Sequence, residues 1–194
     1  RDVPDEAYYD GRVAAEAVRT LGALAKKDAP FFLAVGFWKP HAPFNAPKKY
    51  WDLYDRAKLP PLDEHNAPRP AGAPDIAFHN SSEVLGPSAK RPALTPEAAA
   101  EMRHGYFANI SYMDAQLGKV LDALDASGTA DRTIITFVAD HGYHIGEHTL
   151  WGKTSNFELD ARVPFFVHAP GMKSAGKRTT SPTELLDQIG RAHV

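Results

Sequence analysis

The chain has 194 residues, of which 43% are apolar and 24% charged, and its formal net charge is -2. This composition suffices for one sizeable buried core and excludes a disordered chain, while the lack of a basic stripe argues against nucleic-acid binding. The absence of cysteine excludes disulfides and cysteine-based zinc sites within the chain, and no apolar run approaches the roughly 20 residues of a membrane-spanning helix.

The first half of the chain predicts a helix, a strand and a proline-stiffened loop. A helix is predicted over residues 4–27, and PFFLAVGF at residues 30–37 is an apolar run typical of a strand buried on both faces. Prolines exclude regular structure in the next loop until a short helix begins at Pro47. The apolar positions at helical spacing in the first helix are Val13, Ala17, Leu21 and Leu24.

The region from residue 55 to residue 92 is rich in proline, asparagine, serine and glycine and has no sustained periodicity. Loops of this length in compact domains are usually lids or insertions, so 55–92 is predicted to be a Pro-rich insertion loop that contributes to specificity. Arg69, Lys90 and Arg91 are its candidate contacts for acidic sugars. Solvated surface charge is an equally good interpretation of each.

The second half predicts one long helix and two more strands. The helix begins at Thr95-Pro96-Glu97, with proline at its first position, and ends near Gly128. Residues 133–140 and 163–171 are further continuous apolar strands. The alternation of helices with continuous apolar strands predicts an α/β fold with a mostly parallel sheet covered by helices on both faces. The apolar face of the long helix comprises Tyr106, Ile110, Met113, Leu117, Val120 and Leu124.

Polar side chains follow two of the predicted strands, at the edge where open α/β sheets bind ligands. His41 lies in the Trp-Lys-Pro-His turn after the first strand, and Asp140 and His141 follow the second. A carboxylate beside an imidazole suits a hard or borderline cation. Asp-His-Gly is also ordinary turn chemistry, and a proline-stiffened turn can hold a histidine for purely structural reasons.

Lys153 lies in Trp-Gly-Lys-Thr-Ser, which lacks the leading glycine spacing of a phosphate loop. A lone lysine is usually a solvent-exposed surface residue. Beside an aromatic residue and a glycine in a strand-end loop, it can instead act as a fixed positive charge for an oxyanion.

The string from His144 to His148 matches H-x-x-E-H, a zinc-protease pattern that needs both histidines on one helix. Glycines at 142 and 146 bracket the string just after a strand, so a helix is disfavoured. We therefore expect His144, Glu147 and His148 to order the loop through hydrogen bonds.

Three stretches taken together resemble the sulfatase family of the alkaline-phosphatase superfold, most closely its iduronate-2-sulfatase branch. The likeness extends from about Pro4 to Asp187. The stretches are PFFLAVGFWKPHAPFNAPKKYWDLYD, GYFANISYMDAQLGKVLDAL and TIITFVADHGYHIGEHTLWGKTSNFELDARVPFFVHAPG.

The resemblance implies hydrolysis of the sulfate ester of a saccharide, at a site with one divalent cation, expected to be Ca²⁺. It implies that a formylglycine, made from cysteine or serine, attacks the sulfur. By position, Asp140 and His141 match the family's downstream metal ligands. Lys153 matches a lysine that contacts the sulfate, and His41 a histidine near the leaving group.

The Cys-x-Pro-x-Arg or Ser-x-Pro-x-Arg segment of the family is absent from the sequence. We therefore expect residues 1–187 to be part of a sulfatase catalytic domain whose formylglycine lies upstream, and expect this piece alone to be inactive. Residues 188–194 are expected to be a non-native, adapter-derived tail. Family resemblance places the parent enzyme in the periplasm or outside the cell.

Two alternatives to the sulfatase hypothesis stay open. A phosphodiesterase or phosphonate hydrolase of the same superfold would hold a tetrahedral oxyanion with the same groups. A non-catalytic binding homologue would keep the fold without the chemistry, but the joint presence of Asp140, His141, Lys153 and His41 argues against it.

Overall fold

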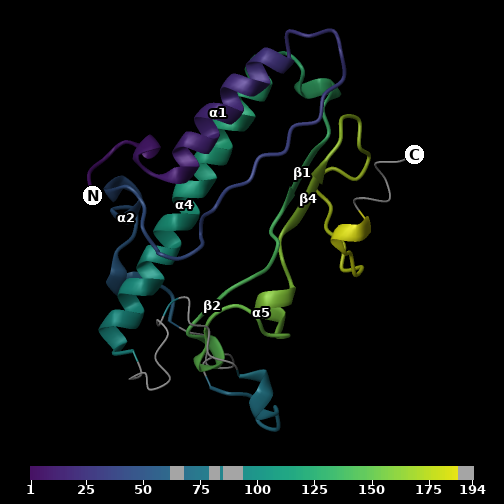
Figure 1. Cartoon of the computed structure of the whole chain (residues 1–194). Coiled ribbons are helices and arrows are strands. Elements are labelled where there is room, and N and C mark those ends of the chain that lie inside the picture. The colour runs from purple at the N-terminus through teal and green to yellow at the C-terminus, as the bar shows by residue number, and fades with distance from the viewer. Residues whose placement is uncertain (62–67, 79–83, 85–93, 188–194) are drawn as a thin grey trace.

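The computed structural model describes residues 1–61, 68–78, 84 and 94–187 (Figure 1). Helices α1 (Tyr9–Leu24) and α4 (Pro96–Ala126) lie side by side, and strands β1 (Ile135–Val138) and β4 (Phe165–His168) form a second layer. The segment 30–38 runs between the two layers in extended form. The shorter elements are α2 (Lys48–Trp51), β2 (His144–Ile145), β3 (Trp151–Gly152) and α5 (Glu158–Ala161), with 3-10 helices η1 (Asp5–Ala7), η2 (Arg56–Lys58), η3 (Asp75–Ala77), η4 (Ala130–Arg132) and η5 (Glu147–Thr149).

The predicted long helix is confirmed as α4 with its end signals, whereas the helix predicted over 4–27 is divided into η1 and the shorter α1. The Thr95 hydroxyl accepts a hydrogen bond from the Ala98 N–H at 3.2 Å, and Pro96 occupies the first turn, where its missing N–H costs nothing. Gly128 follows α4 with a φ of 68°, the left-handed conformation that favours glycine. Pro47 precedes α2 as its N-cap.

The core of the helical layer lies where α1, α2 and α4 meet. Tyr112 of α4 is fully buried, and its hydroxyl accepts from the Gly11 N–H at 2.6 Å and donates to the Asp5 carbonyl at 2.9 Å. A Cβ on Gly11 would lie 2.2 Å from the same carbonyl oxygen, so only glycine permits this approach. The contact therefore fixes the start of α1 against α4.

Asp5 is a second anchor of the helical layer. Its carboxylate is almost fully buried and receives Lys49 Nζ at 2.8 Å and Lys119 Nζ at 2.9 Å, as well as the Tyr50 hydroxyl and the Gln116 amide. Burial alone would raise the pKa of Asp5, but the hydrogen bonds from Lys49 and Lys119 outweigh it and lower the pKa to about 2. The charged form of Asp5 thus stabilises the fold.

The strand pairings correct part of the predicted sheet. β1 and β4 pair in antiparallel register, with Ile135 opposite His168 and Val138 opposite Phe165, and β2 pairs antiparallel with β3. A parallel pair needs a helical crossover of a dozen or more residues, whereas the hairpin β2–β3 and the four-residue α5 return the chain in the opposite direction. In the part of the chain that the structure describes, residues 30–37 are extended but join no ladder.

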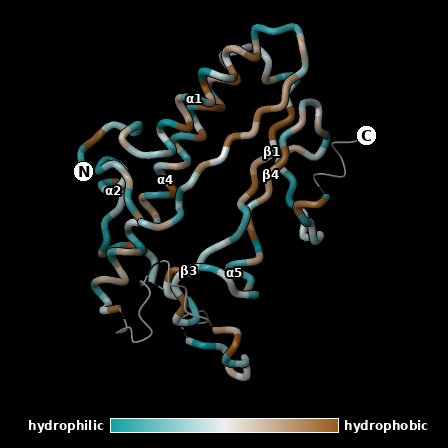
Figure 2. The backbone as a smooth tube through the Cα atoms, viewed as in Figure 1, coloured by the Kyte–Doolittle hydropathy of each residue, from teal (hydrophilic) through white to brown (hydrophobic). Residues whose placement is uncertain are grey.

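Apolar side chains are unevenly covered. Ala14 and Ala108 in the helical layer are completely buried, whereas Phe32 in the extended segment is 90% exposed and Phe166 in β4 is 64% exposed. Figure 2 shows hydrophobic residues along the extended segment and the β1–β4 pair. Apolar side chains are therefore exposed in the extended segment and in β4, whereas Ala14 and Ala108 of the helical layer are buried.

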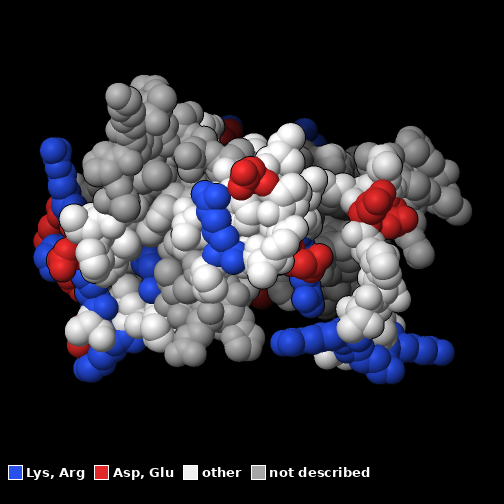
Figure 3. Space-filling model, turned by 90° about the horizontal axis from the view of Figure 1, so that it is seen from below, with Lys and Arg blue, Asp and Glu red and all other residues white. Residues whose placement is uncertain are grey.

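The predicted insertion loop 55–92 falls partly outside the described residues, together with Lys90, Arg91 and the tail 188–194. Its described parts contain the short turns η2 and η3. On the face seen in Figure 3, basic and acidic side chains are interspersed, and a basic group lies at one corner. Across the described residues, every helix is too short or too polar to cross a bilayer.

Candidate functional site

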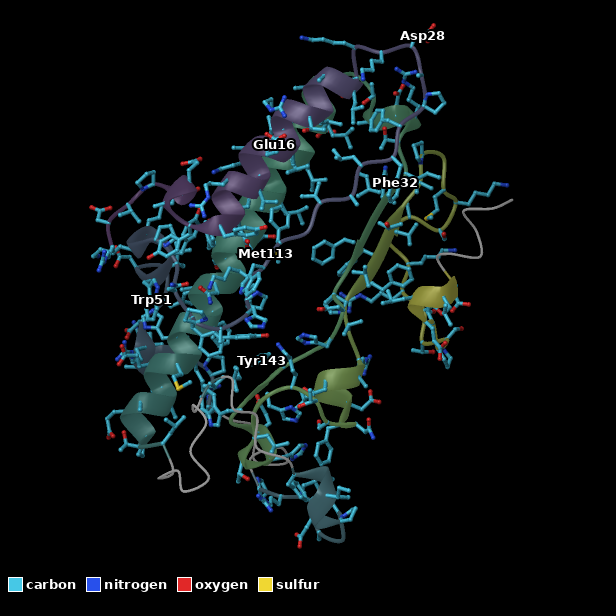
Figure 4. The ribbon with its side chains drawn as sticks, in the orientation of Figure 1. Glu16, Asp28, Phe32, Trp51, Met113 and Tyr143 are labelled. Atoms are coloured by element: carbon cyan, nitrogen blue, oxygen red, sulfur yellow. The ribbon has the colours of Figure 1, made fainter. Side chains whose placement is uncertain are left out.

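A crevice of about 870 Å³ lies between the extended segment, α4 and β1. Its lining includes all four predicted site residues, from two distant stretches of the sequence: His41, Asp140, His141 and Lys153. The apolar part of the lining includes Phe32 and Met113, and Tyr143 lies toward its lower end (Figure 4). The fold thus brings the predicted groups to one crevice.

Asp140 and His141 lie just beyond the end of β1. The Asp140 side chain is 87% exposed, and its Oδ1 accepts a hydrogen bond from the His141 N–H at 3.0 Å. His141 Nδ1 donates to the Gly142 carbonyl at 2.8 Å, which leaves Nε2, 3.8 Å from Asp140 Oδ2, as the basic nitrogen of the neutral ring. An accessible carboxylate and an oriented imidazole are suitable ligands for a divalent cation.

Asp140 and His141 alone do not make up a metal site. Within residues 1–61, 68–78, 84 and 94–187, no three His, Asp or Glu side chains gather closely enough to hold a metal ion. A Ca²⁺ ion takes six to eight oxygen ligands. The Asp140 carboxylate fits such an ion, the His141 imidazole would add a nitrogen ligand of the kind that borderline cations take, and the remaining ligands would come from other groups.

Gly142 is required by a close backbone approach. A Cβ at this position would lie 1.9 Å from the carbonyl oxygen of Leu159 in α5. The Gly142 N–H donates to the Asp160 carbonyl at 2.8 Å. The chain that leaves the Asp140–His141 pair is therefore held directly against α5.

The turn that carries His41 is fixed by Asp10 of α1. The Asp10 carboxylate is buried and accepts the backbone N–H groups of Trp38 and Lys39, each at 2.9 Å. The Trp38 and His41 rings are in edge contact, with centroids 5.0 Å apart. Because Asp10 belongs to the helical layer, that layer positions a histidine of the crevice.

Lys39 closes the same turn from the other side. Its ammonium donates to the carbonyls of His41 at 3.2 Å and Pro43 at 2.6 Å, and to the Asn45 side chain at 2.7 Å. Burial lowers the pKa of Lys39 to about 8, and the nearby Asp10 charge opposes this shift. Sequence reasoning missed both Asp10 and Lys39, because a helical aspartate and a loop lysine are usually surface groups.

Lys153 lies in a segment of unusual backbone conformation. Gly152 has a φ of 111° and Thr154 a φ of 82°, which is rare for a β-branched residue. The Lys153 ammonium lies 5.9 Å from the centre of the Tyr143 ring, and that ring stacks on Tyr106 of α4. Strained conformations of this kind cluster at functional sites.

The H-x-x-E-H string does not form a zinc site on a helix. His144 lies in β2, and Nδ1 of its buried ring is 2.9 Å from Asp160 Oδ1. Glu147 Oε2 accepts from the Ile145 N–H at 2.7 Å, and His148 Nδ1 donates to the Pro68 carbonyl at 3.2 Å. The three residues order the loop through hydrogen bonds, as predicted.

The family assignment follows from comparison with known proteins. A family model described as Sulfatase matches residues 2–191. The chain belongs to the sulfatase family. Iduronate 2-sulfatase of Mus musculus is 40% identical to this sulfatase chain over 177 residues, which is 88% of the chain and 32% of the relative. Choline-sulfatase of Rhizobium meliloti (strain 1021) is 34% identical over 193 residues, which is 96% of the chain and 36% of the relative.

The fold agrees with this assignment. The phosphonate monoester hydrolase SpPMH from Silicibacter pomeroyi superposes with a TM-score of 0.70 and 26% identity, covering 88% of the sulfatase chain and 34% of the hydrolase. This superposition confirms the prediction of a partial alkaline-phosphatase and sulfatase-like α/β fold. The chain spans about a third of the length of the curated relatives that it matches.

Proposed function

We propose that this chain forms part of a sulfuric ester hydrolase that acts on a sulfated saccharide. The observation that carries the proposal is that His41, Asp140, His141 and Lys153 all line one crevice of a sulfatase-family chain. The likeness to iduronate 2-sulfatase supports a sulfated sugar, and on the same ground we propose a periplasmic or extracellular place of action.

In the proposed reaction, Lys153 and His41 act on the sulfate group. The Lys153 ammonium stabilises the charge that develops on the sulfate oxygens, a contribution that fixed cations make best in a site shielded from water. His41 lies in a turn held by Asp10 and Lys39, so its ring contacts the oxygen of the leaving group without first losing conformational freedom.

Asp140 and His141 are proposed to hold a divalent cation, expected to be Ca²⁺, together with ligands outside this chain. Such a cation, when bound, withdraws charge from the sulfate oxygens. Asp140 contributes an accessible carboxylate, and the hydrogen bond from His141 Nδ1 to Gly142 directs Nε2 for coordination.

The proposed nucleophile, a formylglycine, has no precursor in these 194 residues. The sequence contains no cysteine and no Ser-x-Pro-x-Arg segment. We therefore propose that residues 1–187 belong to a catalytic domain completed by further polypeptide, with 55–92 as its insertion loop and 188–194 as a non-native tail. The 194-residue chain alone is expected to release no sulfate from a sulfate ester.

Phosphonate monoester hydrolysis is the second candidate function. It is favoured by the superposition on SpPMH and on the phosphonate monoester hydrolase of Agrobacterium radiobacter, which has a TM-score of 0.67 and 27% identity. A lysine, a histidine and a cation hold a tetrahedral phosphonate as well as a sulfate. The higher identity to iduronate 2-sulfatase makes sulfate the primary proposal.

A chimera tests the function while supplying the groups that the chain lacks. The 177-residue stretch of mouse iduronate 2-sulfatase that matches this chain is replaced by the present sequence. The chimera is assayed with 4-nitrophenyl sulfate, an iduronate 2-sulfate disaccharide, choline sulfate and a phenyl phosphonate monoester. We expect sulfate release from a sulfated sugar, with choline sulfate and the phosphonate as poor substrates.

Variants of the chimera test the proposed roles. Lys153→Met is expected to lower kcat by about 10²-fold to 10³-fold, the usual cost of removing one oxyanion-stabilising group. Lys173→Met, an exposed lysine in a loop beyond β4, is the matched control and should leave kcat unchanged. A folded chimera that hydrolyses only the phosphonate, or one that tolerates Lys153→Met, would contradict the proposal.

A further inference from the structure

Asp160 of α5 is a buried carboxylate with donors from two separate segments. Its side chain is 4% exposed. Oδ1 accepts from His144 Nδ1 at 2.9 Å, and Oδ2 accepts from the Ser155 N–H at 2.8 Å and the Ser155 hydroxyl at 2.6 Å. Each carboxylate oxygen is thus used by a different segment of the chain.

The two segments are those that carry the proposed site residues. His144 lies three residues after His141, and Ser155 lies two residues after Lys153. In addition, the backbone carbonyl of Asp160 accepts from the Gly142 N–H at 2.8 Å, directly next to His141. One residue therefore connects the proposed cation ligands to the proposed sulfate-binding lysine.

The surroundings of Asp160 leave little freedom for these connections to shift. The His144 side chain is 1% exposed, and its ring contacts those of Phe157 and His148 at centroid distances of 5.9 and 5.8 Å. The Asp160 N–H is itself bonded to the Phe157 carbonyl at 2.9 Å. A buried and fully bonded carboxylate fixes its partners more tightly than an exposed one, because water does not compete for its lone pairs.

We propose that Asp160 is a positioning residue, which sets Lys153 relative to Asp140 and His141 by accepting hydrogen bonds from His144 and Ser155 at the same time. This inference rests on the proposed function of those three residues. In the proposed role, Asp160 does not contact the substrate. It acts through the two backbone segments, so its loss should loosen the geometry of the oxyanion site more than it weakens the remainder of the fold.

The test uses the 194-residue chain and inorganic sulfate as the probe. Sulfate affinity is measured by NMR titration for the wild type, Asp160→Asn, Lys153→Met and the double variant. Glu158→Gln is the matched control, because it makes the same carboxylate-to-amide change at an exposed position of the same helix. The amide signals of Gly142 and Ser155, which lie on either side of Asp160, provide a readout that needs no ligand.

We expect Asp160→Asn to weaken sulfate binding by about fivefold to tenfold and to shift both amide signals, because a neutral amide oxygen replaces a charged acceptor. Glu158→Gln should change neither. In the Lys153→Met background, Asp160→Asn should have almost no further effect on sulfate affinity, since the group that it positions is gone. Ser155→Ala keeps the His144–Asp160 pair and should weaken sulfate binding about twofold. It replaces Asp160→Asn in the test if that variant does not fold.

Several results would overturn the inference. Equal losses of sulfate affinity from Asp160→Asn with and without Lys153 would show that Asp160 acts on general stability alone. An unchanged affinity in both Asp160→Asn and Ser155→Ala, with Lys153→Met still defective, would exclude positioning but leave the proposed function intact. A wild-type affinity in Lys153→Met would instead contradict the proposed function, and the inference would fall with it.

Discussion

The helical layer and the strand layer of this chain are stabilised to very different degrees. In the helical layer, Tyr112 is fully buried and Asp5 has two lysine partners and two neutral donors. Outside the helical layer, Phe32 of the extended segment and Phe166 of β4 expose most of their surface, and β1 pairs with β4 alone among the described strands. A single chain thus combines a close-packed part with a part whose apolar faces lack cover.

The comparison explains how the proposed site is built. The helical layer holds the His41 turn through Asp10, whereas Asp140 and His141 follow β1, and Lys153 lies in the chain between β3 and α5. The site therefore depends on the relative placement of the two layers. Changes in the helical layer should reduce the stability of the whole chain, whereas changes on the exposed apolar face should hardly affect it.

The largest effect is expected from Gly11→Ala. The new Cβ would lie 2.2 Å from the Asp5 carbonyl, so α1 must shift and the Tyr112 hydrogen bonds are lost. We expect the free energy of unfolding to fall by about 3 kcal/mol or more. Urea denaturation measures this free energy. Gly22→Ala is the control, because a Cβ at that position would meet nothing within 4 Å. This change should stabilise α1 by about 0.5–1 kcal/mol.

A smaller effect is expected from Asp5→Asn, and it should depend on pH. The pKa of Asp5 is about 2 in the folded chain against 3.8 for an unperturbed group, so the unfolded state binds more protons between these values. The stabilisation of the folded state by the Asp5 charge is therefore complete above about pH 4 and is lost as the pH falls through about 2.

At pH 6 we expect Asp5→Asn to lower the free energy of unfolding by about 2 kcal/mol, with the difference from wild type shrinking toward pH 2. Glu6→Gln, a half-exposed neighbour, is the control and should cost less than about 0.5 kcal/mol. A difference between wild type and Asp5→Asn that stays constant from pH 6 to pH 2 would show that Asp5 acts through packing and not through its charge.

The smallest effect is expected on the strand side. Phe32→Ser should change the free energy of unfolding by less than about 0.5 kcal/mol, because the side chain is already 90% exposed. Leu21→Ala in α1, where the side chain is 3% exposed, should cost about 2–5 kcal/mol under the same conditions. Equal losses in the two variants would remove the distinction between the layers.

The helices were predictable because their signals are local. Thr95-Pro96 marked the start of α4 and Gly128 its end. The antiparallel pairing of β1 with β4 was not predictable, because strand direction depends on the path of residues 139–164 and not on the composition of either strand.

The site shows the same division between local and distant signals. His41, Asp140, His141 and Lys153 were proposed as site residues from their positions after predicted strands and from family likeness. Asp10 and Asp160 were missed, since their carboxylates accept hydrogen bonds from groups 5 to 29 residues away in the sequence, a relation that only the folded chain reveals.

The most direct test of the central claim is paramagnetic broadening of NMR signals by Mn²⁺ bound to the chimera, which supplies the cation ligands that the 194-residue chain lacks. We predict the strongest broadening at the amides of Asp140 and His141, with clear broadening of the Lys153 and His41 side-chain signals, reversed by EDTA and abolished by Asp140→Asn. Sharp His41 and Lys153 signals beside a broadened Asp140 would contradict the claim that the two distant stretches meet around one cation and one oxyanion.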